Sequence, residues 1–398
     1  MIRDDTQPAG LWHLFLIFLR LGLTSFGGPV AHIGYFRDEF VIRRRWMTDH
    51  AFADLLALCQ FLPGPASSQM NFAIGYARGG IWGAMLAFAG FTLPSALVLM
   101  LLAALWGTAP PDGLAGGLIH GLKLVAVAVV AHALLGMARS LAPDGPRAGV
   151  ALAALAVVSL WPGMGLAQIA AIALGAAIGA GLRLGPSVRD GQMEPGIMPS
   201  RRTGTICLAL FALLLATVPL LAQAGLWGQI FASFYGAGAL VFGGGHVVLP
   251  LLETGTVSTG LVSADSFLAG YGAAQAVPGP LFTFAAWLGQ VAGGVPGALL
   301  ALAAVFLPGL LLVMGALPFW TQISTHPQAR HAMAGANAAV VGILGAALYQ
   351  PVFTSAVLSP ADFTLAVGLF LMLTIWNRPA WQVVLAGLIL GTILTGIR

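Results

Sequence analysis

Apolar residues run in long stretches along nearly the whole chain, and short clusters of glycine, proline and arginine separate the stretches. A helix needs roughly 20 apolar residues to cross the hydrocarbon core of a bilayer. In the first part of the chain the apolar stretches lie at residues 11–34, 52–77, 81–106, 114–138, 148–161 and 164–182. This pattern predicts an all-α integral membrane protein with six spans in that region.

The sequence repeats itself after about 215 residues. Gln60 and the segment Pro63–Pro65 correspond to Gln275 and Pro278–Pro280, and further landmarks follow in the same order at the same spacing. Self-similarity that keeps order and spacing over such a length indicates two copies of one structural unit.

The repeat divides the chain into five regions. They are a tail at 1–10, a first repeat half at 11–183, a polar linker at 184–203, a linking helix at 204–224 and a second repeat half at 226–398. Six spans return the chain to its starting side, and the linking helix then brings the second half in with the opposite orientation. The predicted architecture is a helical bundle of two inverted-topology repeats, about 13 spans (6+1+6), with Gly/Pro-broken helices.

Arginines test the inversion, because cytoplasmic loops carry an excess of positive charge. The first half places Arg78, Arg139 and Arg147 after its second and fourth expected spans, whereas the second half places Arg330 and Arg378 after its third and fifth. With a cytoplasmic N-terminus, all five lie on the inner side, as the inversion requires.

Arg37 and Arg43–Arg45 are the exception, because a first span that crosses the membrane would put them outside. The glycines and proline at 27–29 are able to break this segment into a re-entrant or interfacial one. The number of spans near residues 24–50 therefore stays open.

Composition excludes several other classes of protein. Hydrophobic residues make up 59% of the chain and charged residues 8%, which leaves no soluble domain. The net charge of +4 comes from loop arginines and reflects membrane topology, so we expect no nucleic-acid partner. Cys59 and Cys207 lie in apolar stretches, where we expect small buried side chains and no metal site. We expect no cleaved signal peptide and no cofactor.

Glycine and proline interrupt the apolar stretches at two pairs of equivalent positions. The members are Phe26, Gly27, Gly28 and Pro29 with Gly243, Gly244 and Gly245, and Pro63, Gly64 and Pro65 with Pro278, Gly279 and Pro280. Lipid cannot satisfy the backbone groups that such breaks free. A helix that restarts after a break presents free N–H groups and a partial positive charge, which favour an anion. We predict a central anion site where the breaks converge, and the alternative is that the breaks serve packing alone.

Polar side chains accompany the breaks, mainly in the first half. They are Gln60, Ser67, Ser68, Gln69 and Asn71 in the first half, and Gln275 and Thr283 in the second. Two cations, Arg20 and Lys123, lie inside expected spans, and Asn337 is the equivalent of Lys123. Intramembrane charge is costly, so we predict that both cations contact the anion; the alternative is that they snorkel to an interface. We expect residues of the first half to balance most of the anion's negative charge.

Four residues are candidates for carrying a coupled proton. His32 and His246 follow the glycine elements, and Glu39 and Glu253 lie beyond them. A histidine titrates near neutral pH, although lone histidines are more often structural hydrogen-bond partners. Asp265 is expected to be a first-turn acid of its helix.

Enzyme motifs are absent: the chain has no GxxxxGK[ST], HExxH or GxSxG sequence. We therefore expect no catalytic residues, and energy must come from an ion gradient. An intramembrane enzyme would need a general acid and a general base at the same depth in the membrane. The sequence supplies only histidines and scattered carboxylates near the ends of the expected spans. A passive anion channel is a further alternative.

Motifs in both halves resemble those of the chromate ion transporters in their long, two-domain form. The motifs are Phe26–Pro29 with Ala31–Ile33, Arg45-Trp46, Gln60 with Leu62–Pro65 and Ser68-Gln69, repeated as Phe242–Gly245 and Gln275–Pro280. The resemblance covers the whole chain. It implies export of chromate across the bacterial inner membrane by a multi-pass protein, chromate resistance, and coupling to the proton gradient. It leaves a homodimer open.

The residues alone leave the substrate undecided. Chromate and sulfate are tetrahedral dianions of similar size, and helix ends with one lysine distinguish them poorly. Sulfate or another oxyanion is therefore the alternative substrate.

Overall fold

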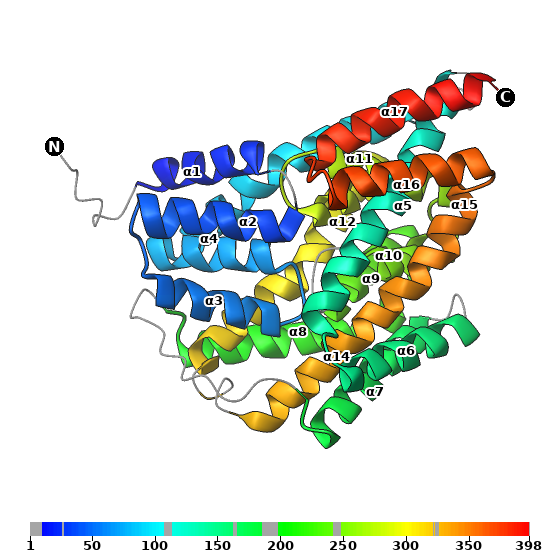
Figure 1. Ribbon diagram of the computed structural model, residues 1–398. Helices are drawn as coiled ribbons and strands as arrows, with labels where there is room; N and C mark the ends of the chain where they lie inside the picture. The colour runs from blue at the N-terminus through cyan, green and yellow to red at the C-terminus, as the bar shows by residue number, and fades with distance from the viewer. Residues whose placement is uncertain are drawn as a thin grey trace.

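The computed structural model describes residues 10–25, 28–106, 114–161, 165–184, 198–241, 248–320, 322 and 326–397. Every regular element in these residues is a helix, which confirms the all-α prediction (Figure 1). Within them, five helices are long and apolar enough to cross a membrane: Ala66–Trp106, Gly116–Leu141, Arg201–Leu221, Leu281–Phe319 and Pro327–Ala356.

The first helices form a hairpin instead of one span. α1 (Leu11–Thr24) is followed by α2 (Gly28–Arg37) and a π-helical turn, η1 (Asp38–Arg43). The Nη1 atom of Arg44 lies 3.5 Å from Nε2 of His13, so the start of α1 and the end of η1 share one face of the protein.

A second hairpin follows on the same face. α3 (Asp49–Phe61) leads to a non-helical turn, and α4 (Ala66–Trp106) starts after it. The guanidinium of Arg78 lies 4.7 Å from the ring centroid of Trp46, so the first part of α4 runs back to the place where α3 begins. The structure therefore has two short helices where the sequence predicted one span at 52–77.

Within α4 the chain reverses once more at two glycines. Gly79 and Gly80 have non-helical backbone angles, with φ of −146° and 60°, and Gly75 then packs directly on Gly83. Gly80 needs to be glycine because its φ is positive. The second part of α4 is the first long apolar helix of the chain.

The second half repeats these devices. α9 (Gly225–Leu240) and α10 (Val248–Thr256) form one hairpin, and α11 (Ala264–Ala276) forms the next with η3 (Leu281–Thr283) and α12 (Phe284–Ala316). Hydrogen bonds join the arms, from Ser233 Oγ to Gly255 O at 2.7 Å and from Trp287 Nε1 to Ser266 O at 3.0 Å.

The reversal within α12 matches the reversal within α4. Gly293 and Gly294 have φ values of −150° and 63°, within a few degrees of the values at Gly79 and Gly80. Because the backbone angles agree at equivalent positions, the internal repeat of the sequence is also a repeat of the structure.

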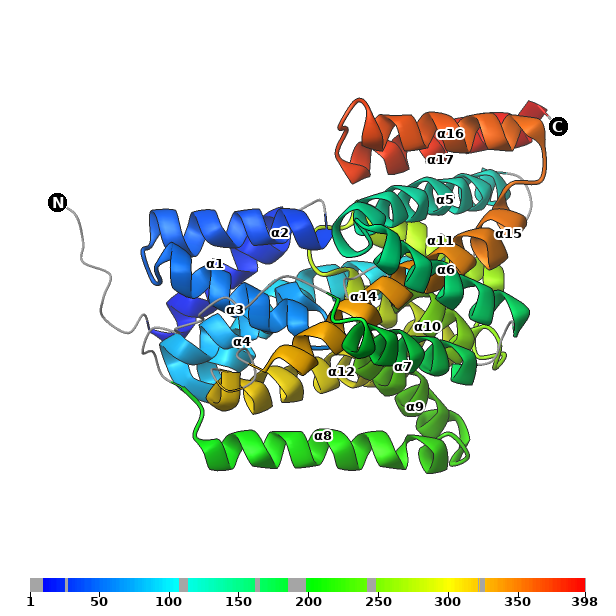
Figure 2. The same cartoon turned by 60° about the horizontal axis from the view of Figure 1, so that its bottom comes forward.

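The remaining helices lie beside the hairpins, most of them on the side of the bundle away from α1 and α2 (Figures 1 and 2). They are α5 (Leu114–Leu141), α6 (Gly145–Leu160), α7 (Gly165–Gly181), α8 (Arg201–Leu221), η4 (Leu317–Phe319), α14 (Pro327–Ala347), η5 (Leu348–Phe353), α15 (Thr354–Ala356), α16 (Pro360–Thr374) and α17 (Ala380–Ile397). Small residues allow close packing of helices in lipid, and two such contacts join the halves: Gly175 of α7 with Gly335 of α14, and Gly121 of α5 with Gly387 of α17.

The linking helix α8 lies along the outside of the bundle (Figure 2). Its start packs near the end of α12, where the Arg201 guanidinium lies 5.9 Å from the Phe319 ring centroid. Its end contacts Gly228 at the start of α9. α8 thus begins three residues before the expected 204–224 helix, and it joins the two halves from one end of the bundle to the other.

The second parts of α4 and α12 run in opposite directions. The first begins beside α1, where Gly79 contacts Leu11, and it ends with Trp106 packed 5.5 Å from Trp287 of the other half. The second begins beside Trp227 of α9 and ends in an apolar cluster that includes residues of α1 and α3. The two halves are therefore packed head to tail.

The hairpins also change the position of the exceptional arginines. Arg43–Arg45 end the first hairpin at Trp46, and Arg78 contacts the same Trp46. These arginines therefore share one face, because each hairpin returns to the side from which it came.

Close packing at Gly75 generates a stability prediction. A Cβ atom at this position would lie 2.5 Å from Ala87 Cβ and 2.6 Å from Gly83 O, so Gly75→Ala must push the two parts of α4 apart. Overpacking of this kind costs about 1–3 kcal/mol. We expect a lower unfolding temperature of the purified protein in detergent.

Gly136→Ala is the matched control, because a Cβ there meets nothing within 4 Å. It should leave the unfolding temperature unchanged or raise it, since alanine favours the helix by roughly 0.5–1 kcal/mol. Equal behaviour of the two variants would contradict the packing assigned to Gly75.

Candidate functional site

The breaks of the two halves meet through a reciprocal pair of backbone hydrogen bonds. Gly64 N–H donates to Val241 O at 2.7 Å, and Gly279 N–H donates to Ser25 O at 3.0 Å. Each proline-glycine-proline loop thus caps the end of a hairpin arm from the other half. The loops and the residues that lead into the glycine elements therefore converge inside the protein.

Both loops need their glycines. Gly64 and Gly279 have φ of 120° and 105°, a region that residues with a Cβ rarely adopt. Each glycine also rests on the long helix of the opposite half, Gly64 on Gly309 of α12 and Gly279 on Ser95 of α4. Gly309 and Ser95 are themselves equivalent positions of the repeat, so the contact has the same symmetry as the hydrogen bonds.

Some polar groups beside the breaks stabilise the loops. Gln69 Nε2 donates to Pro63 O at 2.9 Å and to Gly309 O at 3.1 Å, which ties the first loop to α12. Thr283 Oγ1 donates to Pro280 O at 2.7 Å within the second loop. These two side chains hold the breaks in shape.

Other buried polar atoms near the breaks have no hydrogen-bond partner in the described protein. They are Ser25 Oγ, His32 Nδ1, Ser68 Oγ, Gln69 Oε1, Asn71 Oδ1, Thr92 Oγ1 and Gln275 Nε2. An unpaired buried polar group costs about 1–3 kcal/mol, so a cluster of them is retained only for a reason. Binding of a polar ligand is such a reason.

The start of α4 has the chemistry that an oxyanion needs. Ser67 and Ser68 are buried in its first turn, where backbone N–H groups lack partners within the helix and the helix dipole is positive. Ser68 adds a hydroxyl that is fully buried. The arrangement offers several donors to a negative charge without a fixed cation.

His32 belongs to the same centre. Its ring is fully buried against Phe91, and Nε2 lies 3.2 Å from Ser25 O, the carbonyl that also accepts Gly279 N–H. His32 thus contacts the carbonyl oxygen that accepts one of the two hydrogen bonds between the halves.

The structure does not bring Lys123 to the breaks. Its Nζ atom lies 2.5 Å from Oδ1 of Asp265 in the first turn of α11. That turn is about 16 Å along the helix axis from Ala276, which precedes the second loop. Asn337, the equivalent of Lys123, has a buried Oδ1 without a partner in the described protein.

Arg20 and Gln60 are exposed in the structure. Arg20 lies on an outer stripe of α1 with Leu16 and Leu23, which are 41% and 53% exposed. Their contact with an anion stays a prediction from the sequence. Phe26, Gly27, Gly243–Gly245 and His246 lie outside the described residues, as do the side chains of Gly28 and Pro29.

The two candidate glutamates have different surroundings. Glu39 pairs with Arg44 at 2.6 Å and with Arg43 at 3.1 Å. Glu253 lines a cavity between the halves, described below. No group of three or more His, Cys, Asp or Glu side chains in the described part of the chain is placed to hold a metal ion.

Sequence reasoning missed four residues of this centre. Ser25 and Val241 supply the accepting carbonyls, and Thr92 and Ser95 face the breaks from α4. Ser25 and Val241 both directly precede a Phe-Gly-Gly element, so the repeat itself held the signal.

Comparison with known proteins gives one consistent result. A family model described as "Chromate transporter" matches residues 12–180 and 228–392. The chromate transport protein of Pseudomonas aeruginosa is 30% identical over 85% of this chain and 80% of its own length. The probable chromate transport protein of Synechococcus elongatus is 30% identical over 86% of this chain and 85% of its own. No solved structure matches.

The first loop generates a second stability prediction. Gly64→Ala places a Cβ atom 2.9 Å from Gly309 Cα, in addition to the backbone strain of its positive φ. Gly260 also has a positive φ, 76°, but a Cβ there meets nothing within 4 Å. Gly260→Ala should therefore show the strain alone, about 1–2 kcal/mol.

We expect Gly64→Ala to lower the unfolding temperature in detergent clearly more than Gly260→Ala. The difference measures the contact between the loop and α12. Equal losses in the two variants would argue against a close contact at Gly309.

Proposed function

The chain belongs to the chromate transporter family, and from this premise we propose that it is a secondary active transporter that exports chromate from the cytoplasm. The transporter lies in the bacterial inner membrane, works as a proton antiporter and confers chromate resistance. The relatives are named as transport proteins, which supports a transporter and not an enzyme.

The observation that carries the proposal is the meeting of the breaks at Gly64 and Gly279. Reciprocal hydrogen bonds hold the breaks together, and unpaired buried polar atoms lie near them, among them the Ser68 hydroxyl, which can donate. A tetrahedral dianion accepts many hydrogen bonds, so it can use Ser68 Oγ and the first N–H groups of α4 together. The other substrate-binding residues predicted from the sequence belong to this proposal.

The two halves form inverted repeats in the membrane under this proposal. The head-to-tail packing of α4 and α12 supports the inversion, because equivalent helices then cross in opposite directions. A hairpin that returns to the face from which it came does not cross the membrane. The number of crossings therefore falls by an even number, and both ends of each half stay on their predicted sides. The face that carries Arg43–Arg45 and Arg78 is cytoplasmic by the positive-inside rule, and so is the N-terminus.

Proton coupling fits the position of His32. A proton on this ring makes both nitrogens donors, which changes its contact with Ser25 O. Because Ser25 O also accepts Gly279 N–H, protonation acts directly on one of the bonds between the halves. His246, Glu39 and Glu253 remain further candidates for the proton.

Sulfate is the alternative substrate. Neutral donors at a helix start recognise charge and tetrahedral shape, which chromate and sulfate share. Competition of excess sulfate against chromate flux separates the two substrates.

Everted membrane vesicles test the function and its direction. Vesicles whose interior is more acidic than the surrounding medium should accumulate chromate, because export from the cell corresponds to uptake into an everted vesicle. Ser68→Ala should reduce uptake at low chromate roughly tenfold or more, since a hydrogen bond to a charged group contributes about 1.5–3 kcal/mol. Uptake is measured as vesicle chromium, normalised to the amount of protein in the membrane.

Ser140→Ala is the matched control, because Ser140 Oγ donates to Gly136 O and Met137 O within its own helix, α5. It should transport like the unchanged protein. Normal uptake by Ser68→Ala would remove Ser68 from the site, and uptake that survives collapse of the proton gradient would indicate a channel.

Lys123 is tested by pairing its variant with one at Asp265. Under this proposal Lys123 leaves its ion pair with Asp265 and binds the anion. We therefore expect Lys123→Ala to reduce chromate uptake. The additional substitution Asp265→Asn should not restore uptake in the double variant. The same vesicle assay measures both. Full recovery in the double variant would show that Lys123 only neutralises Asp265.

A further inference from the structure

Glu39 and Glu253 occupy equivalent positions, each seven residues after a histidine. Glu39 has two arginine partners, Arg43 and Arg44, which neutralise its charge. The corresponding positions after Glu253 are Val257 and Ser258. The second half has therefore kept the carboxylate without its arginines.

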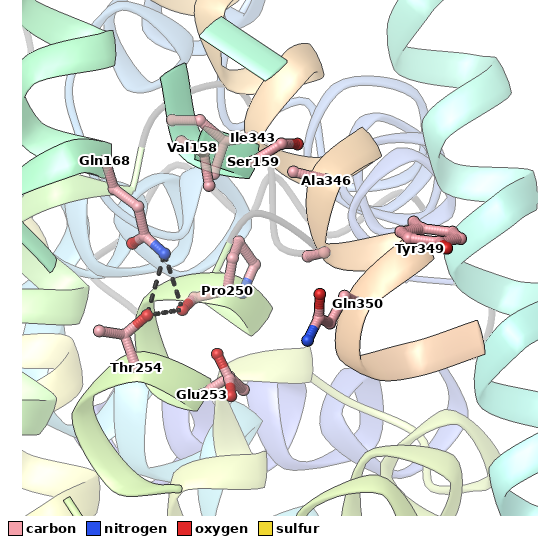
Figure 3. A pocket seen from close by; sticks show the side chains of 11 residues that line it. Val158, Ser159, Gln168, Pro250, Glu253, Thr254, Ile343, Ala346, Tyr349 and Gln350 are labelled. Carbon is pink, nitrogen blue, oxygen red and sulfur yellow. Dashed lines mark hydrogen bonds between the residues drawn. The ribbon is translucent and has the colours of Figure 1, made fainter. Parts of the chain in front are cut away.

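Glu253 instead lines a cavity of about 150 Å³ between the halves. α6 and α7 of the first half and α10, α14 and η5 of the second half form its walls. Figure 3 shows the Glu253 carboxylate in the cavity, with the Gln350 amide beside it and Tyr349 pointing away. Among the residues that the structure describes, the cavity is lined by one carboxylate and by no cationic side chain.

Gln168 closes one wall of this cavity with its amide group, and its Oε1 atom points away from Glu253 in Figure 3. The residue is 5% exposed, and its Nε2 donates to Pro250 O at 3.2 Å and to Thr254 Oγ1 at 3.0 Å (Figure 3). A carbonyl only accepts, so the amide nitrogen must face Pro250. The opposite atom, Gln168 Oε1, is consequently the buried end without a partner in the described protein.

The wall at Gln350 is irregular backbone. Leu348–Phe353 form a π-helix, and Gln350 has non-helical angles of φ −132° and ψ 120°. Such backbone at membrane depth persists where it lines a cavity, and π-helical turns are frequent at functional sites. With Ser159 on the opposite rim, the cavity is surrounded by oxygen-bearing groups.

We propose that this cavity is a binding site for a monovalent hard cation of the sodium type, held by Glu253 and by neutral oxygens of the cavity walls that include Gln350 Oε1 and Ser159 Oγ. One carboxylate balances a single positive charge, and hard cations take oxygen ligands. The volume accommodates the ion with a few waters, each of which occupies about 30 Å³. A dianion is repelled by the same carboxylate, so this site is separate from the site at the breaks.

The site has a structural route to the breaks. α10 carries Glu253 and starts directly after the glycine element of the second half, whereas Ser159 belongs to α6 of the first half. A bound cation therefore joins the halves at a second place. Only this link to transport rests on the proposed function, because binding of the cation can be measured without any anion.

Purified full-length protein in detergent tests the site. The unfolding temperature is measured while sodium chloride replaces choline chloride at constant ionic strength. We expect sodium to raise it by several degrees, because a ligand that binds only the folded state stabilises it. Glu253→Gln should abolish the sodium response while being at least as stable as the unchanged protein in choline, since it removes an uncompensated charge.

Glu39→Gln is the matched control from the equivalent position. It should lose stability in both salts, because Arg43 and Arg44 lose their partner, and it should keep the full sodium response. Gln350→Leu provides a second variant of the site and should weaken the apparent sodium affinity about tenfold or more.

A sodium response that persists in Glu253→Gln overturns the proposal. The proposal is also wrong if the unfolding temperature of the unchanged protein depends on pH but not on sodium. That result indicates that Glu253 binds a proton and no sodium ion. Chromate transport measured in vesicles is independent of both results, so a failure of the proposed function is recognised separately.

Discussion

Backbone groups in hydrocarbon must find partners inside the protein, and this constraint governs the structure of the whole chain. Four hairpin breaks would each leave N–H and C=O groups exposed to lipid. The protein brings breaks of both halves together, so that Gly64 N–H meets Val241 O and Gly279 N–H meets Ser25 O. Neither half satisfies these groups alone, which explains why the two halves pack against each other at the breaks.

Duplication left equivalent positions free to differ, and the differences carry the chemistry. Gly64 rests on Gly309, whereas Gly279 rests on the polar Ser95. Arginines neutralise Glu39 but not Glu253. The repeat therefore gives the two halves a common backbone arrangement, and the differences between equivalent positions distinguish the proposed anion site from the proposed cation site.

Sequence reasoning predicted the helices, because glycine, proline and apolar length act locally, and the backbone at Gly79–Gly80 and Gly293–Gly294 follows the repeat of the sequence. It left the first hairpin open as a re-entrant segment. It did not predict the second, since two half-length helices such as α3 and the start of α4 are as apolar as one span. The ion pair of Lys123 with Asp265 could not be read from the sequence, because the two residues lie 142 positions apart. The contact of Lys123 with an anion stays a prediction. Arg43–Arg45 carried information about the first hairpin, because their position broke the charge rule at the end of that hairpin.

The reciprocal bonds at the breaks also constrain how such a protein can move. In this conformation Gly64 and Gly279 donate to protein carbonyls, so their N–H groups are not available to an anion at the centre. A path to either face requires that one half shift against the other, and each shift must replace the lost backbone partner. An anion can accept the N–H groups that a shift frees, whereas lipid cannot. The anion and the backbone carbonyls are thus alternative acceptors for the same N–H groups. A shift of one half against the other therefore costs the least free energy when the anion is bound.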